Sequence, residues 1–167
     1  MNRPLFSTAL TFIDTSALRL SKQSSRIMSS PLKDVWVALD HVQLAIPPDS
    51  EAACREFYVG ILGMAEVEKP ANLAKRGGLW LRTRNVQIHL GVDADFHPAR
   101  KAHPAIVASD VTAVATHLSA KGIEVVWDES LSDRKRFYVY DNVGNRLEIV
   151  QAIELEISIG HVLKKDP

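Results

Sequence analysis

Apolar residues along this chain fall in short runs separated by polar stretches, a pattern that predicts a mixed α and β structure. Residues 35–46 form an apolar run interrupted by His41, which is typical of a buried strand. A helix is expected next, beginning at Asp49 or Ser50 and ending at Gly63. Four of its apolar residues have the spacing of one helix face: Cys54, Phe57, Tyr58 and Ile61. Three short strands are expected next, near residues 65–68, 78–83 and 86–92.

The same order of elements then repeats. His103 opens a second apolar run, Asp110 is the expected N-cap of a helix that ends at Gly122, and strands are expected at 123–127, 136–140 and 145–151. Gly63 and Gly122 are 59 residues apart, as are His89 and Glu148. We therefore expect an α+β fold of two tandem βαβββ modules, about 35–92 and 102–151, forming a curved mixed sheet around a cavity.

Strand alternation assigns polar residues to the cavity face of this sheet. His41 and Gln43 point away from Val42, Leu44 and Ile46, which a helix can cover. The same alternation places His89, His103 and Glu148 on the inner face. Gln87 shares this face with His89. The two modules thus offer polar residues at equivalent positions.

Three imidazoles and one carboxylate directed at one cavity suit a divalent transition metal, and a set of two histidines and one carboxylate leaves positions open for substrate. The alternative is that each inward histidine is a hydrogen-bonded core residue and that Glu148 is solvated. Repetition at equivalent positions favours the metal site.

Composition excludes some classes of function. Lys plus Arg and Asp plus Glu number 20 each, and no basic patch interleaved with aromatic residues suggests nucleic acid. No apolar run approaches the ~18 residues of a membrane span, so a soluble protein is expected. Cys54 is the single cysteine, which rules out an internal disulfide, and it is expected to be an inert core thiol.

The first thirty residues are rich in serine and threonine and hold four basic residues against one acid, which is a targeting composition. The predicted division is a leader over 1–33, a domain over 34–152 and a tail over 153–167. A transit peptide would send the protein to mitochondria or plastids. A disordered leader, or a translation start at Met28, would leave it cytoplasmic.

The stretches "LDHVQLAI", "REFYVGILGM", "KAHPAIVASDV" and "FYVYDNVGNRLEIV" resemble the vicinal oxygen chelate superfamily, which includes glyoxalase I, extradiol dioxygenases and bleomycin-binding proteins. The resemblance covers about residues 35–151. It implies that His41, His103 and Glu148 bind a metal. His89 stands where glyoxalases usually carry a further acidic ligand, so it is either a fourth ligand or a residue of the substrate cavity.

Departures from the family patterns narrow the implied function. Gln43 replaces the threonine of fosfomycin-resistance proteins, and bleomycin-binding members lack the ligands that this chain keeps. The resemblance then implies a metal-dependent lyase or isomerase of glyoxalase type, acting on a small oxygenated substrate, with Glu148 moving a proton. An extradiol-type dioxygenase using iron, for which Tyr138 or Tyr140 is available, and a non-catalytic small-molecule binding protein are the alternatives.

The remaining expectations concern the cofactor, the substrate and assembly. The metal is left open among Zn, Ni, Fe and Mn, and substrate contacts are expected from Gln43, Gln87 and Tyr138. Open sheet edges predict a homodimer. Five charged residues are interpreted as solvated loop charges: Arg100, Lys101, Arg134, Lys135 and Arg136. His97 and His117 are interpreted as surface residues.

Overall fold

The structure is a computed structural model that describes residues 35–153, and the described residues from Ala38 onward belong to one compact unit. The predicted leader over 1–33 and all of the predicted tail except Ile153 lie outside the described residues. In the part that is described, no helix has the length and apolar character needed to cross a membrane.

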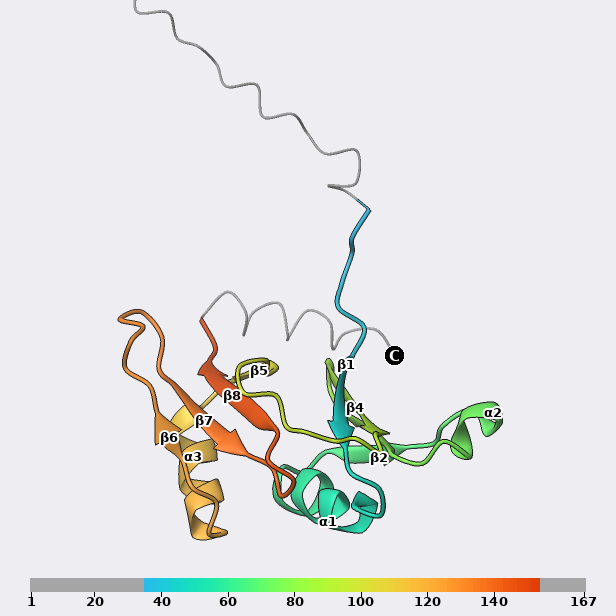
Figure 1. The fold of residues 1–167 in the computed structure, drawn as a ribbon. Helices are drawn as coiled ribbons and strands as arrows, with labels where there is room; N and C mark the ends of the chain where they lie inside the picture. Colours follow the sequence, from blue (N-terminus) through green and yellow to red (C-terminus); the bar gives the residue numbers. More distant parts are fainter. Residues whose placement is uncertain (1–34, 154–167) are drawn as a thin grey trace, which may run out of the picture. The chain divides into compact units, whose positions relative to one another are not determined.

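The first module contains a four-stranded sheet in the order β1-β4-β3-β2, with β1 parallel to β4 and the other pairs antiparallel (Figure 1). A π-helical segment, η1, continues α1 directly. The elements of this module are β1 (Val42–Ile46), α1 (Glu51–Arg55), η1 (Glu56–Ile61), β2 (Ala65–Val67), α2 (Ala71–Ala74), β3 (Leu79–Thr83) and β4 (Val86–Val92).

The second module repeats this topology with the order β5-β8-β7-β6, and β5 is parallel to β8. Its elements are β5 (Ala105–Ala108), α3 (Val111–Ala120), β6 (Val126–Trp127), β7 (Arg136–Tyr140) and β8 (Arg146–Gln151). The expected α+β fold of two tandem βαβββ modules is therefore confirmed. Only the short helix α2, inserted between β2 and β3, has no counterpart in the expected order.

Helix ends follow from local side-chain chemistry. The Asp110 carboxylate accepts the backbone N–H of Ala113 at 2.9 Å, as the N-cap expected for α3. At α1, Glu51 Oε1 accepts the N–H of Gly78 at 2.9 Å and thereby ties the helix start to the chain entering β3. Gly78 has φ +77°, and a Cβ there would lie 2.0 Å from the carbonyl oxygen of Leu90, so this position requires glycine.

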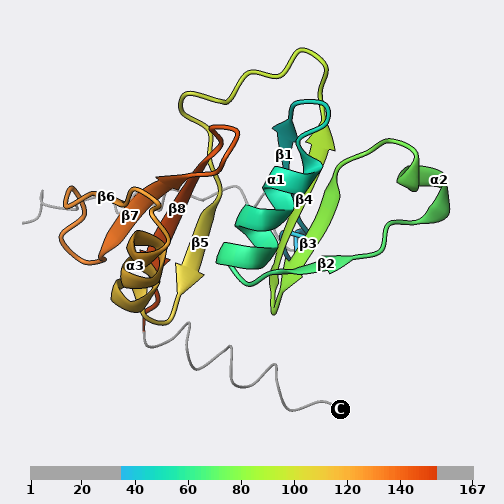
Figure 2. The same ribbon diagram turned by 90° about the horizontal axis from the view of Figure 1, so that it is seen from below.

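One apolar core lies against the helices of both modules. α1 covers one face of the first sheet and α3 one face of the second (Figure 2). Cys54 is fully buried in this core, as expected for an inert thiol. The strand residues of the core alternate along each strand. They include Ile46, Leu79, Leu81, Ile88 and Leu90 in the first sheet and Phe137, Val139, Leu147 and Ile149 in the second.

A buried polar network joins the two modules. The Tyr58 hydroxyl donates to Asp141 Oδ2 at 2.9 Å, across 83 residues of sequence. Asn145 Nδ2 donates to the carbonyl of Ala45 at 2.9 Å and to the same carboxylate oxygen of Asp141 at 3.0 Å. Burial, with the nearby Asp141 charge, raises the pKa of Tyr58, so its hydroxyl stays protonated and donates. The network fixes the loop before β8 against η1 and β1.

Candidate metal and substrate site

The inner face of the first sheet carries a stack of three rings. The His41 and His89 ring centroids are 3.9 Å apart, and Trp80 stacks on the other face of His89 at 4.2 Å. His89 is in register with Trp80 on β3 and with Gln43 on β1, so the sheet itself sets this arrangement. His41 and His89, both predicted from alternation, are thus brought together.

Hydrogen bonding prepares His41 to offer one ring nitrogen. Its Nδ1 lies 2.7 Å from Asp40 Oδ2, and in the neutral ring an Nδ1–H donated to this carboxylate leaves the Nε2 lone pair for a ligand. Burial, and then the neighbouring His41, lowers the pKa of His89, which favours its neutral form. Neutral imidazole is the form that binds metals.

The inner face of the second sheet brings His103 and Glu148 together. His103 Nε2 lies 2.9 Å from Glu148 Oε2, while His103 Nδ1 lies 2.7 Å from the carbonyl oxygen of Lys101. Arg136 Nη1 donates to Glu148 Oε1 at 2.8 Å, and Arg136 Nη2 donates to Asp128 Oδ2 at 2.9 Å. One oxygen of Glu148 is therefore held by arginine, and the other faces His103.

The electrostatics of this group keep Glu148 ionised. Burial by itself would raise the pKa of Glu148, but the hydrogen bonds from His103 and Arg136 outweigh it, and the pKa is lowered. Glu148 is only 7% exposed, so its charge depends on these partners. An ionised carboxylate beside an imidazole nitrogen can accept either a proton or a metal ion.

Arg136 was expected to be a solvated loop charge, and that interpretation is wrong. It lies half-buried on β7 and binds the predicted catalytic carboxylate. The signal was present in the sequence, because the strand predicted at 136–140 places Arg136 on the same face as Tyr138. Tyr138 itself meets His103 edge to face, with ring centroids 5.3 Å apart. The sequence pattern assigns Arg146 to the same face as Glu148, but it does not indicate the parts played by Asp40 and Trp80.

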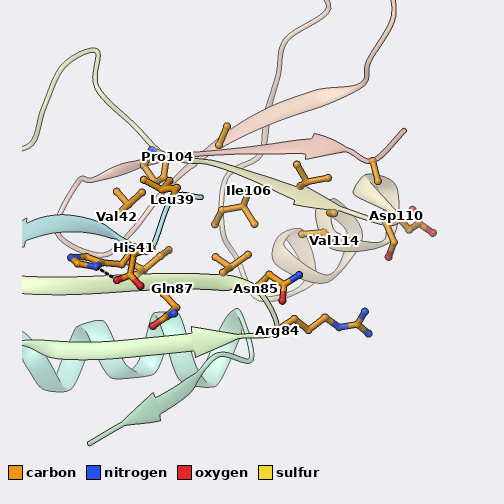
Figure 3. A pocket seen from close by; sticks show the side chains of 18 of the residues that line it. Leu39, His41, Val42, Arg84, Asn85, Gln87, Pro104, Ile106, Asp110 and Val114 are labelled. Carbon is orange, nitrogen blue, oxygen red and sulfur yellow. Dashed lines mark hydrogen bonds and ion pairs between the residues drawn. The ribbon is translucent and has the colours of Figure 1, made fainter. Parts of the chain in front are cut away.

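The structure does not gather all four predicted ligands into one group within a single chain. Among residues 35–153, no three His, Cys, Asp or Glu side chains are placed to hold an ion together. A cavity of about 910 Å³ lies between the β1 and β4 end of the first sheet and the β5 and α3 end of the second (Figure 3). His41 and Gln87 line this cavity, whereas His89, His103 and Glu148 do not.

Three further residues for which the sequence predicts a position are Gln43, His97 and His117. The Gln43 amide packs over Gly91, where a Cβ would lie 2.8 Å from Gln43 Nε2. His97 and His117 are both exposed, as expected, and His117 Nε2 lies 3.0 Å from the carbonyl oxygen of Ile61.

No protein-family model matches this chain, and no curated protein sequence matches it.

Solved structures are similar over the described domain. A glyoxalase family protein from Bacillus anthracis is 42% identical over 71% of this chain and 97% of its own length, with a TM-score of 0.69. A lactoylglutathione lyase from Agrobacterium tumefaciens is 18% identical over 70% of this chain and 95% of its own, with a TM-score of 0.54. An antibiotic binding protein from a Streptomyces species is 18% identical over 71% of this chain and 100% of its own, with a TM-score of 0.55. The two weaker similarities support the fold alone.

Proposed function

This chain belongs to the glyoxalase family of the vicinal oxygen chelate superfamily, and from that premise we propose that it is a metal-dependent lyase or isomerase acting on a small oxygenated substrate. The chemistry of its donor atoms fits a divalent transition metal. A bound ion of this kind polarises substrate oxygens as a Lewis acid.

The observation that carries the proposal is the pairing of His103 with Glu148. Two ligands that each lie about 2.1 Å from an ion and meet it at a right angle are about 3 Å apart. His103 Nε2 and Glu148 Oε2 are 2.9 Å apart in a hydrogen bond, so an ion would take the place of the shared proton with little movement of either side chain. The Lys101 carbonyl and Arg136 hold the opposite atoms of these two groups, as outer partners of metal ligands commonly do.

On the first sheet, the Asp40 carboxylate is hydrogen-bonded to His41 Nδ1 in a similar way, and His41 Nε2 is the nitrogen that would bind an ion. Together with His103 and Glu148, His41 makes a set of two histidines and one carboxylate, which keeps coordination positions open. His89 stacks on His41 and is either a fourth ligand or a polar residue beside the substrate. Glu148, ionised and next to the open positions, is the group that moves a proton.

We further propose that the complete site forms in a homodimer. Among residues 35–153, β1 pairs only with β4 and β5 only with β8, so in this part of the chain each sheet presents an open edge beside its histidine. A second copy that packs the first sheet of one chain against the second sheet of the other would bring His41 and His89 to His103 and Glu148. Each dimer would then hold two composite sites.

Metal content tests this function directly. The wild-type protein, purified without added metal or chelator, is expected to contain about one ion of Zn, Ni, Fe or Mn per chain. His41→Ala, His103→Ala and Glu148→Ala are each expected to lose it while staying folded, and exposed His97→Ala is expected to keep it. Normal metal content in any two of the three variants would refute the ligand set.

The position of Tyr138 favours an extradiol-type dioxygenase as the second candidate. Its ring lies edge-on to His103, where it can contact a bound phenol. This candidate requires iron and consumes oxygen, so an oxygen electrode with a catechol separates it from the lyase or isomerase. Ligand binding without any metal would instead indicate a non-catalytic binding protein.

A further inference from the structure

The two arginines on the inner face of the second sheet differ in how their charge is balanced. Arg136 donates to both Glu148 and Asp128, so two carboxylates surround one guanidinium. Arg146 lies two positions before Glu148 on β8 and therefore on the same face. Within residues 35–153, no salt bridge joins Arg146 to a carboxylate. Arg146 is thus a half-buried cation that no carboxylate contacts directly among these residues.

The position of Arg146 is fixed by groups other than carboxylates. Its Nη2 donates to the Lys101 carbonyl and lies 2.8 Å from His103 Nδ1. Its guanidinium carbon is 5.0 Å from the centre of the Tyr138 ring. An arginine placed against an aromatic ring keeps in-plane N–H donors for a further partner. These contacts hold the cation beside the His103 and Glu148 pair without neutralising it.

The first module has no such cation at the equivalent position. Gln87 precedes Arg146 by 59 residues, the spacing that also relates His89 to Glu148, and its side chain is neutral. Arg146 is therefore a feature of the second module alone. A divalent ion held by Glu148 would add two positive charges to the same face, which disfavours a neutral substrate and favours an anionic one.

We propose that Arg146 binds an anionic group of the substrate, so that the substrate is a small oxygenated acid such as a 2-hydroxy or 2-oxo carboxylate. A carboxylate accepts charge-assisted hydrogen bonds from guanidinium N–H groups that have no other partner. His103 and Glu148 then face the oxygen on the adjacent carbon. The proposal rests on the proposed function for the identity of the site and adds the class of its substrate. A phosphonate has the same anionic chemistry and is tested separately.

Calorimetry with matched probes tests this. Lactate is expected to bind the full chain at least tenfold more tightly than lactamide, which has nearly the same shape and no charge. Arg146→Gln is expected to remove this preference, and Arg146→Lys to keep part of it. Arg55→Gln, which removes an arginine from the exposed pair with Glu66, is expected to keep it in full.

Each outcome decides the proposal. Tighter binding of 1-hydroxyethylphosphonate than of lactate, with the same dependence on Arg146, would support it with phosphonate as the anionic group. The proposal would be overturned if the wild type showed no preference for acid over amide, or if Arg146→Gln retained that preference. It would also be overturned if no probe bound at millimolar concentration. Thermal melts of every variant show whether the fold is retained.

The same variants keep this inference distinct from the proposed function. Zinc affinity is measured on each of them beside the probe affinities. A chain that binds no metal but retains an Arg146-dependent preference for lactate would refute the metal site and support this inference. A chain that binds metal with no such preference would do the reverse.

Discussion

At the residue scale, His89 is the side chain whose position in the repeat suggests one role and whose contacts suggest another. Its 59-residue relation to Glu148 makes it the counterpart of a ligand. Its position between the rings of His41 and Trp80 leaves it only 7% exposed, and burial lowers its pKa. A neutral, oriented imidazole serves equally well as a ligand or as a hydrogen-bonding partner of substrate.

Substitution of His89 separates these roles. If His89 is a ligand, His89→Ala is expected to weaken metal binding roughly tenfold or more, whereas His89→Glu keeps the metal because a carboxylate is also a ligand. Zinc titration against a competing chelator measures both variants. Unchanged metal affinity in His89→Ala together with lost turnover would place the residue on the substrate instead.

At the element scale, strands and helix ends are set by local patterns that can be read from the sequence. Alternation placed Leu147 and Ile149 in the core and Glu148 on the inner face, and Asp110 caps α3 as expected. The sequence predicts a helix that includes η1 but not its π-helical hydrogen bonding, and it does not predict helix α2. Neither an altered hydrogen-bond pattern nor a four-residue helix leaves a distinctive spacing of apolar residues. Arg136 was misassigned because charge was given more weight than its place in a strand.

The contact that ties α1 to β3 should make stability depend on pH. The hydrogen bond from the Gly78 N–H is the main cause that lowers the pKa of Glu51 from its usual 4.5. A lowered pKa stabilises the fold above the unfolded value, and this contribution is lost as the pH falls through the folded pKa. Glu51→Gln is therefore expected to lower the free energy of unfolding by about 1 kcal/mol at pH 7 and by much less at pH 3.

Urea unfolding at the two pH values measures the difference between the variant and the wild type. Glu56→Gln, an exposed acid on the adjoining η1, is the matched control and is expected to change little at either pH. Equal stability of Glu51→Gln and the wild type at pH 7 would show that the contact with Gly78 contributes nothing.

At the scale of the whole molecule, the candidate site is divided between two sheets. The sequence predicts which residues face inward, but a repeat cannot indicate whether the two modules that share a site belong to one chain or to two. That choice depends on how the sheet edges meet, and edges carry no residue pattern of their own. His41 with His89, and His103 with Glu148, are therefore found as two separate pairs.

Mixing two inactive variants tests whether the site is composite. His41→Ala and Glu148→Ala chains, unfolded and refolded together, are expected to form mixed dimers in which one of the two sites has every ligand intact. Metal content of the mixture should then exceed that of either variant refolded alone. Sedimentation should show particles of twice the 18.5 kDa chain mass. No gain on mixing, or monomers at micromolar concentration, would contradict the composite site.

The hydrogen bond between Tyr58 and Asp141 makes each of the two modules depend on the other. Its donor belongs to the first module and its acceptor to the second, and the Asn145 bond to Ala45 crosses the same boundary in the other direction. Either module produced alone would leave a polar group of this network without its hydrogen-bond partner from the other module. The two modules are therefore expected to unfold together as one unit rather than one after the other.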